Sequence, residues 1–262
     1  MHGADRAILY SSKLVAERRQ LERADGSINE AWRSILRRKH FPELSAPTSA
    51  PAIVLRCCLK SIAASYRLMD ELNTRANTKY DATVTAHERK LLELWDLLMP
   101  HEKLTSRHTT QWQKIGFQGK DPATDFRSMG MLALDDLHYY AKHHPTSAQH
   151  VLRCSQDSDR WYSFAIVGIH ITSFAVQTLH TRRLQHHLYR YGITRAVYHE
   201  YYSYLFHSFN DYWMSRTPAP TIMDFERVFV DFRVRIETHL LERRPTLLDE
   251  SCITALSKAE VA

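Results

Sequence analysis

The segment WYSFAIVGIHITSFAVQTLHT (residues 161–181) contains no aspartate, glutamate, lysine or arginine. By length alone it could cross a bilayer. However, His170, Gln177 and His180 interrupt its apolar character, and no topogenic charge pattern flanks it. We therefore expect a helix that is buried on all sides in a helical core, rather than a membrane span.

Apolar residues recur at helical spacing in most of the remaining chain. In HERKLLELWDLLM (residues 87–99), leucines and a tryptophan occupy the i, i+3, i+4 and i+7 positions, and Pro100 follows as a stop signal. The same spacing predicts helices over 53–73, 194–216 and 225–240. No segment alternates apolar and polar residues between hairpin turns. The expected fold class is all-α, with a single compact multi-helix domain and a helical N-terminal extension.

Glycine is scarce in this chain. Only seven of the 262 residues are glycine, whereas about eighteen would be expected at the usual roughly 7%. Barrels, sandwiches and doubly wound sheets use more glycine in their tight turns, so its scarcity supports an all-α fold. Three of the seven, Gly116, Gly119 and Gly130, lie within fifteen residues of one another. This cluster predicts a loop of unusual backbone geometry.

The composition divides the chain into four segments. We expect a basic helical extension over 1–45, the first helix and linker of the domain over 52–84, the main part of the domain over 85–244, and a C-terminal tail over 245–262. The best linker is APTSAP (residues 46–51), because two prolines and small residues cannot continue a helix.

The positive charge is concentrated near the N-terminus. Residues 1–60 contain eleven lysines and arginines against six acids, while the remaining residues contain twenty-four against twenty-three. Such a basic region could contact anionic lipid or nucleic acid, although a solvated helix face is the simpler interpretation. No zinc finger, RNP aromatics or GXXG loop accompanies it. We expect no nucleic-acid partner, and weak contact with an anionic membrane stays an alternative.

The N-terminus and the cysteines indicate a cytoplasmic protein. Asp5 lies in the N-terminal segment, which has no secretory apolar run. The four cysteines (Cys57, Cys58, Cys154 and Cys252) lack zinc spacing, and we expect them to be reduced and mostly buried. The expected protein is cytoplasmic, at most peripheral at membranes, neither secreted nor membrane-spanning.

The sixteen histidines do not form a recognisable metal motif. HExxH fails after both His87-Glu88 and His101-Glu102. His180 and His187 share a helix face, but no carboxylate or cysteine lies nearby in sequence to complete a site. GxSxG, P-loop and dinucleotide motifs are absent as well. We expect no metal, no cofactor and no nucleotide site in this chain.

The segment WQKIGFQGKDPATDFRSMGMLALDDLHYY (residues 112–140) places the three clustered glycines in a loop that leads into a helix at about 128–131. Arg127 would be a cation on an ordered loop, the kind of position where function is often found. A salt bridge from Arg127 to Asp121, Asp135 or another acid is the structural alternative. Asp125 is two residues away, a spacing that does not place both side chains on one helix face.

The run GFQGKDPATDFRSMGMLAL (residues 116–134) resembles the signature of the ELMO domain in the ELMO domain-containing (ELMOD) proteins. In these a Trp, a GFQ, a DPxTDFR and a following helix occur in this order. The upstream HERKLLELWDLLMP and the downstream SFAIVGIHITSF, FNDYWMSR and MDFERVFVDFRVRIE are similar to the rest of that domain. The resemblance covers about residues 85–244. It departs from the family at Ser128 and Ala133, where glycine is common.

The resemblance implies a GTPase-activating protein for Arf and Arf-like small GTPases, with Arg127 as the catalytic residue supplied in trans. An inserted arginine can accelerate GTP hydrolysis by about 10³–10⁵. Its planar guanidinium can donate to two oxygens and stays protonated. Such a protein is a regulator rather than an enzyme in the strict sense. GTP and Mg²⁺ would belong to the partner GTPase in its GTP state.

The resemblance also gives positions for the other residues of the loop. Candidates for partner contact are Gln118, Lys120, Asp121 and Asp125. Residues expected to shape the loop are Trp112, Gly116, Phe117, Gly119, Pro122, Thr124, Phe126 and Gly130. We expect Thr124 and Asp125 to cap the helix that follows.

Two other functions remain as alternatives. The first is a non-catalytic ELMO-type interaction scaffold in small-GTPase, cytoskeletal or membrane-traffic signalling. The additional repeat and PH-like regions of that branch have no room in 262 residues, and the intact DFR motif is typical of the activator branch. The second is a lipid-surface adaptor, which rests only on the basic first sixty residues.

Overall fold

A computed structural model describes residues 2–23, 25–40 and 48–242 of the chain. All regular elements are helices, and the described residues contain no strand. The all-α prediction is confirmed. The predicted tail over 245–262 lies outside the described residues, as do the first two residues of the predicted linker.

The chain divides into two compact units that are described separately. The first consists of Met1–Glu71 and Leu184–Val197, and the second of Leu72–Arg183 and Tyr198–Ala262. Two helices, α4 (Ala50–Asn77) and α10 (Arg195–Met214), contribute residues to both units. The first unit therefore contains more than the basic extension expected over 1–45.

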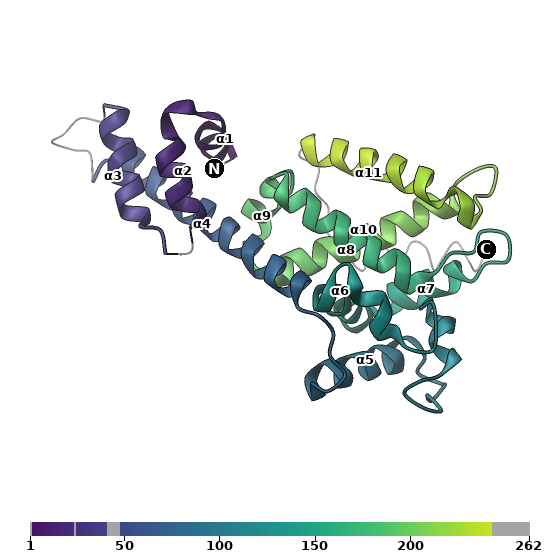
Figure 1. Ribbon diagram of the computed structural model, residues 1–262. Helices are drawn as coiled ribbons and strands as arrows, with labels where there is room; N and C mark the ends of the chain where they lie inside the picture. Colours follow the sequence, from purple (N-terminus) through teal and green to yellow (C-terminus); the bar gives the residue numbers. More distant parts are fainter. Residues whose placement is uncertain (1, 24, 41–47, 243–262) are drawn as a thin grey trace. The chain divides into compact units, whose positions relative to one another are not determined.

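The first unit packs short helices against the first half of α4 (Figure 1). Its elements are α1 (His2–Tyr10), the 3₁₀ turn η1 (Ser12–Leu14), α2 (Val15–Glu22), α3 (Ile28–Arg38), the start of α4, and α9 (Gln185–Tyr191). Ser27 caps α3 by accepting the Glu30 N–H at 3.3 Å. The Trp32 indole N–H donates to the Ala52 carbonyl at 2.9 Å and ties α3 to α4. An apolar core forms between these helices.

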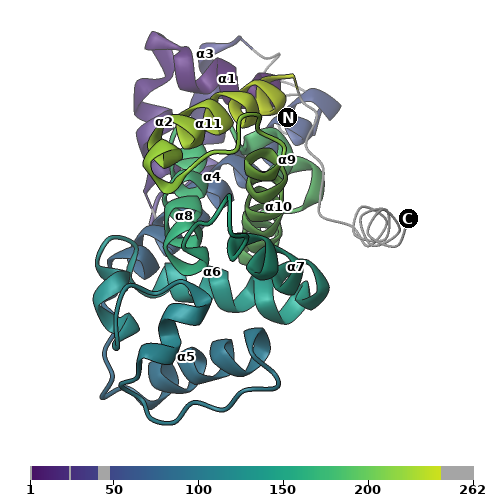
Figure 2. The same cartoon turned by 90° about the vertical axis from the view of Figure 1, so that its right-hand side faces the viewer.

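The second unit is layered (Figures 1 and 2): α11 lies over α8 and α10, α6 and α7 follow, and α5 lies on the far side. Its further elements are α5 (Thr85–Leu98), the 3₁₀ helices η2 (Thr110–Ile115) and η3 (Pro122–Arg127), α6 (Gly130–His143), α7 (Pro145–Ser155), α8 (Phe164–His180), η4 (Ile222–Asp224) and α11 (Phe225–Leu241).

The charge-free segment forms α8, and most of its side chains are buried. Gly168 permits close packing, because an added Cβ would lie 2.5 Å from the Leu137 side chain and 2.9 Å from the Tyr202 hydroxyl. The predicted buried core helix is confirmed. No single helix of the described ranges is long and apolar enough to cross a membrane, although α8 followed by α9 passes that test as a bent pair.

Aromatic side chains fix α10 against α11. Phe209 of α10 has its ring centroid 6.0 Å from Phe225, 5.7 Å from Phe229 and 5.4 Å from Phe232. The three α11 residues follow the apolar stripe read from the sequence, so this stripe is the buried face of the helix.

Helix α4 extends beyond the end expected near Asn73-Thr74 and stops at Asn77. The polar residues continue the helix because their side chains bond to its carbonyls: Asn77 donates to the Asn73 oxygen at 2.9 Å and Thr78 to the Thr74 oxygen at 2.8 Å. Arg75 adds an ion pair with Asp135 of α6 at 2.5 Å. A polar composition was therefore misread as a linker.

Candidate functional site

The connection between α5 and α6 carries the predicted site and is anchored by a chain of aromatic rings. Trp112 is fully buried, with its ring 5.5 Å from Trp95 and 5.9 Å from Phe117. Phe117 continues to Phe126 at 5.6 Å, and Phe126 stacks on Tyr80 at 5.7 Å. Burial of these rings holds both 3₁₀ helices against α5 and the end of α4.

Gly116 and Gly130 occupy positions that exclude a side chain. Gly116 has φ +84°, and an added Cβ would lie 2.3 Å from the Phe164 nitrogen at the start of α8. Gly130 has φ +48°, and its Cβ would lie 2.3 Å from the Thr78 carbonyl oxygen. At both positions the left-handed conformation and the neighbouring backbone require glycine.

Gly119 and its neighbours differ from these two glycines. Gly119 does not have a positive φ, and an added Cβ would meet nothing within 4 Å. The structure therefore does not need glycine there for a bend. Lys120 has an exposed side chain, while its carbonyl accepts the Thr109 N–H at 3.1 Å. Pro122 is buried as the first residue of η3, where a missing N–H is tolerated.

Arg107 is the electrostatic centre beneath the loop. Its Nε lies 2.5 Å from Oε1 of Glu88 on α5, and its Nη2 lies 3.0 Å from Oδ1 of Asp121. The guanidinium also lies 6.0 Å from the ring centroids of Tyr80 and Trp112. Tyr80 donates a hydrogen bond to Glu88, and burial together with this bond raises the pKa of Tyr80. Arg107 thereby joins α5 to the start of η3.

We predict that replacing Arg107 with methionine lowers the free energy of unfolding by about 2–3 kcal/mol, because Glu88 and Asp121 would be left partly buried without their cation. Urea unfolding followed by circular dichroism measures this change. Arg153→Met is the matched control, since Arg153 is exposed and forms no ion pair with the residues described. Equal stabilities of the two variants would show that Arg107 does not hold the loop.

Asp121 and Asp125 point into the loop rather than out of it. Asp121 caps η3 by accepting the Ala123 N–H at 3.0 Å, and its own carbonyl accepts the Thr124 hydroxyl at 3.0 Å. Asp125 is buried and accepts the Gln118 N–H at 2.9 Å. Both acids therefore stabilise the backbone of the loop. The side chain of Gln118 in the same loop is exposed.

The expected cap of the following helix by Thr124 and Asp125 is wrong. These residues lie inside η3, which runs on to Arg127, and the N-cap position of α6 is Met129, without a side-chain bond. The Met131 N–H instead donates to the Thr78 carbonyl at 2.8 Å. The end of α4 thus supplies the acceptor that the sequence suggested would come from a local side chain.

Burial raises the pKa of Asp125 above its ordinary value of 3.8, although the Gln118 N–H and the charge of Arg127 oppose the shift. Between pH 3.8 and the raised folded pKa, Asp125 holds a proton in the folded protein that the unfolded chain has lost, so stability falls as the pH rises through this interval, and above it Asp125 is a buried charge.

We predict that Asp125→Asn is at least as stable as the wild type at pH 7, because an asparagine oxygen can still accept the Gln118 bond without a buried charge. Its stability advantage should disappear as the pH falls toward 3.8. In contrast, Asp121→Asn should lower the free energy of unfolding by about 1 kcal/mol at pH 7, because the ion pair with Arg107 is lost. Thermal unfolding from pH 4 to 7 compares them; a less stable Asp125→Asn would contradict the assignment.

Arg127 is the last residue of η3, and its side chain is exposed. The salt bridge considered as an alternative is not formed with any acid in the described part of the chain. Asp121 is paired with Arg107, and Asp135 is paired with Arg75 and Lys90, both at 2.5 Å. Although burial opposes it, these two cations lower the pKa of Asp135. Arg127 forms no ion pair with any residue that the structure describes.

Ser128 follows Arg127 with φ −85° and ψ −39°, a conformation that any residue adopts. The backbone at this position therefore accommodates serine and does not require the glycine expected from the resemblance. Ser128 and Gln118 both have exposed side chains.

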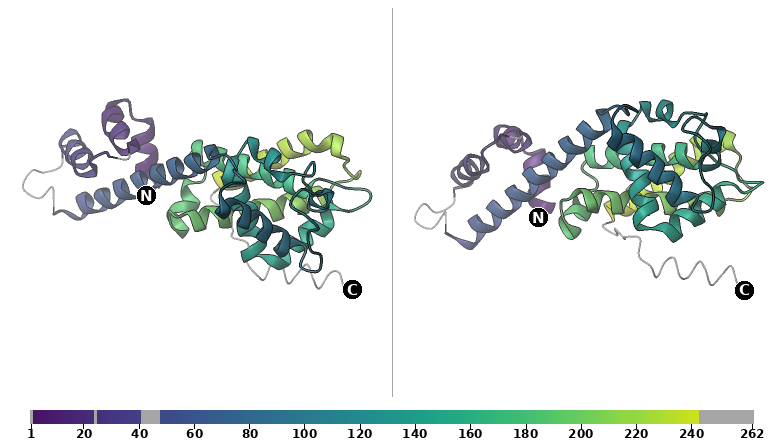
Figure 3. Two further views of the ribbon diagram at one scale, coloured as in Figure 1. Left: turned by 60° about the horizontal axis from the view of Figure 1, so that its bottom comes forward. Right: turned by 90° about the horizontal axis from the view of Figure 1, so that it is seen from below.

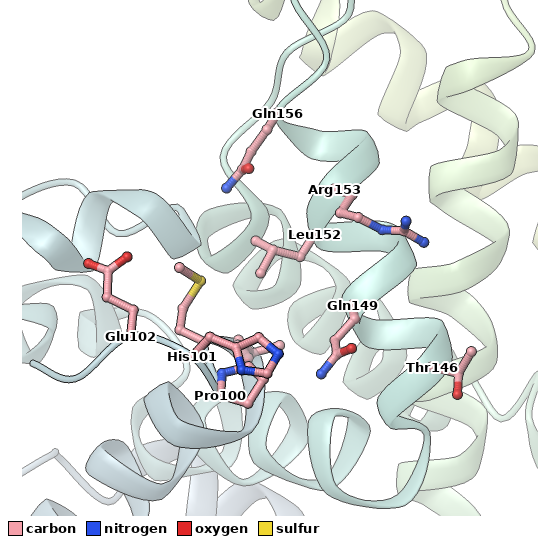
Figure 4. Close-up of a pocket in the computed structure, with 10 residues that line it drawn as sticks. Pro100, His101, Glu102, Thr146, Gln149, Leu152, Arg153 and Gln156 are labelled. Carbon is pink, nitrogen blue, oxygen red and sulfur yellow. The ribbon is translucent and has the colours of Figure 1, made fainter.

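An open pocket of about 620 Å³ lies between the end of α5 and α7 (Figure 4). Leu98 and Leu152 are buried along its lining, and His101 and Arg153 are exposed at it. Glu102 at its edge is held by Lys114 at 2.7 Å. None of the predicted site residues lines this pocket. Within residues 2–23, 25–40 and 48–242, no three histidine, cysteine or acidic side chains are placed to hold a metal.

Sequence reasoning missed Arg107, Glu88 and Tyr80. Nothing in the local pattern marks Arg107, because its partners are nineteen residues before it and fourteen after it and meet it only in the folded loop. In the sequence, Arg107 precedes His108 in a polar stretch, a pattern typical of an exposed loop residue.

Comparison with known proteins identifies the family. The sequence model of the ELMO/CED-12 family matches residues 70–229, which is more than half of the chain. Over 222 residues the chain is 35% identical to ELMO domain-containing protein 2 of Mus musculus, covering 84% of this chain and 75% of that protein. Over 204 residues it is 39% identical to ELMO domain-containing protein 1 of Mus musculus, covering 70% and 62%. ELMO domain-containing protein B of Dictyostelium discoideum is 34% identical over 178 residues, with coverages of 68% and 62%. This chain belongs to the ELMO/CED-12 family.

Proposed function

We propose that this protein activates GTP hydrolysis by an Arf or Arf-like small GTPase, and that Arg127 enters the partner's active site as an arginine finger. The observation that carries the proposal is the exposed Arg127 side chain at the end of a braced 3₁₀ helix, without an ion pair to any described residue. Membership of the ELMO/CED-12 family supports it.

The chemistry requires a positive charge placed where negative charge develops. During GTP hydrolysis, charge spreads over the γ-phosphoryl oxygens and the leaving oxygen, and a guanidinium in trans stabilises both. An arginine already engaged by an acid would have to break that pair first. Arg127 has no ion pair to break among the described residues, where Asp121 and Asp135 are engaged by other cations.

The neighbouring residues divide into two groups under this proposal. Gln118 and Lys120 have exposed side chains on the same loop and are the candidates for contact with the GTPase. Asp121 and Asp125 bond within the loop, so their role is to hold its backbone. Gly119 leaves open space above the backbone, through which a partner could approach closely. The partner would provide GTP, Mg²⁺ and the water-positioning glutamine.

Single-turnover GTP hydrolysis by a panel of Arf and Arf-like GTPases tests the proposal, with the full chain added in catalytic amounts. We expect at least one GTPase to be strongly stimulated. Absence of stimulation across the panel would contradict the proposal. Binding to a GTP-loaded member without stimulation would instead support the interaction scaffold.

A further inference from the structure

The first half of α4 has an apolar face that its own unit does not cover. Ile53 is 51% exposed and Val54 61%, and Cys57, one turn further, is exposed as well. The opposite face of the same helix buries Ala52, Leu59 and other apolar residues against the core of the first unit. Figure 3 shows α1, α2 and α3 gathered on one side of this part of α4.

The spacing of the exposed residues makes this face continuous. Positions 53, 54 and 57 lie within about 100° of one another around a helix, so their side chains form one stripe. Ala50 is also exposed and extends the stripe toward the start of α4. Single exposed apolar residues are ordinary, whereas an apolar stripe on a helix that is buried on its other side indicates a binding surface.

Charge identifies what this surface fits. Between Thr48 and Met69 the sequence contains three cations, Arg56, Lys60 and Arg67, and no acid. All three side chains are exposed, and none forms an ion pair with a described residue. Arg56 lies over the Trp32 ring at 5.4 Å and donates to the Asn29 side chain at 2.9 Å, which holds it at the α3 side of the helix.

We propose that the first half of α4 docks on the surface of a bilayer that contains anionic phospholipids. The side chains of Ile53, Val54 and Cys57 enter the boundary between head groups and acyl chains, while Lys60 and Arg67 contact lipid phosphates. An amphipathic helix binds in this way through apolar insertion together with attraction of basic residues to anionic lipids. The absence of acids between Thr48 and Met69 favours a uniformly negative surface over a protein partner of mixed charge.

This inference goes beyond the proposed activation of a GTPase and does not depend on it. It concerns three cations of α4, of which Arg56 and Lys60 belong to the basic first sixty residues and Arg67 follows them. A membrane contact through a few apolar residues and a few cations is reversible.

The first experiment measures flotation of the full chain with vesicles of phosphatidylcholine, with and without phosphatidylserine. We expect binding to the vesicles that contain phosphatidylserine, and about tenfold weaker partitioning of the double variant Ile53→Ser/Val54→Ser. The control is Val230→Ser/Val234→Ser, which removes two exposed valines of α11, 43% and 60% exposed, and should bind as the wild type does. Equal loss in both double variants would overturn the assignment to α4.

The second experiment separates the electrostatic contribution. Lys60→Gln/Arg67→Gln should weaken vesicle binding about thirtyfold, since each basic residue near an anionic surface contributes about 1 kcal/mol. Lys103→Gln/Arg153→Gln is the charge-matched control on exposed cations elsewhere and should leave binding unchanged. Equal binding to pure phosphatidylcholine would overturn the proposal. A concentration-dependent dimer that Ile53→Ser/Val54→Ser abolishes would also overturn it, in favour of a second copy of the chain.

Discussion

Replacing Arg127 with alanine should reduce the stimulated rate of GTP hydrolysis by about 10³-fold or more, to near the intrinsic rate of the GTPase. The fold should not change. The Arg127 side chain is exposed and pairs with no described acid, so its removal should alter the free energy of unfolding by less than about 0.5 kcal/mol. A large kinetic effect without a stability effect is the result expected of a group that acts only on the partner.

Arg127→Lys is the sharper variant because it keeps the charge. Lysine presents a compact ammonium and cannot bridge two oxygens with a planar fork. We therefore expect it to remain at least about a hundredfold below the wild type. If Arg127→Lys were as active as the wild type, the arginine-finger mechanism would be wrong even though activation stands.

The matched control is Arg153→Ala on α7, an exposed arginine of the same unit that lies beside the α5–α7 pocket. It should keep full stimulation. Binding of each variant to a GTPase loaded with a transition-state mimic distinguishes two failures. If Arg127→Ala binds the ground-state GTP form normally but has lost affinity for the mimic, the arginine acts in the transition state.

Helices with a strong local signal were predictable from the sequence. The stripe in residues 87–99 and the charge-free segment become α5 and α8, because periodic apolar residues determine which face is buried, wherever the partner comes from. The aromatic residues and glycines of the loop could also be singled out from the sequence, because aromatic rings favour burial and clustered glycines favour turns.

Long-range polar contacts were not predictable. Arg107 forms ion pairs with Glu88 and Asp121, and the Thr78 carbonyl accepts a hydrogen bond from the start of α6. These contacts join residues from separate elements. Local sequence offered Thr124 and Asp125 as the nearest capping groups, and tertiary contact replaced them. Residues 184–197 likewise join the first unit through contacts that no local sequence pattern predicts.

The three clustered glycines also differ in ways that sequence could not separate. All three occur in one motif, yet two face backbone atoms and one faces open space. Replacing each glycine with alanine adds the same methyl group. Differences in the free energy of unfolding between the three variants therefore reflect the surroundings of each position.

We expect Gly116→Ala and Gly130→Ala each to lower the free energy of unfolding by about 3 kcal/mol or more, because a left-handed φ and a backbone clash act together. The clashing atoms are the Phe164 nitrogen and the Thr78 oxygen, both 2.3 Å from the added Cβ. Neither can move as the end of a flexible side chain would. Thermal and urea unfolding measure the loss.

Gly119→Ala is the control within the same loop, and its stability should stay within about 0.5 kcal/mol of the wild type. An added methyl there meets nothing within 4 Å, and φ is not positive. Equal destabilisation of all three variants would contradict the backbone geometry of the loop. If Gly119→Ala is stable but stimulates GTP hydrolysis less, the open space above Gly119 is where the GTPase approaches, and the loss should appear in the concentration needed for half-maximal stimulation rather than in the maximal rate.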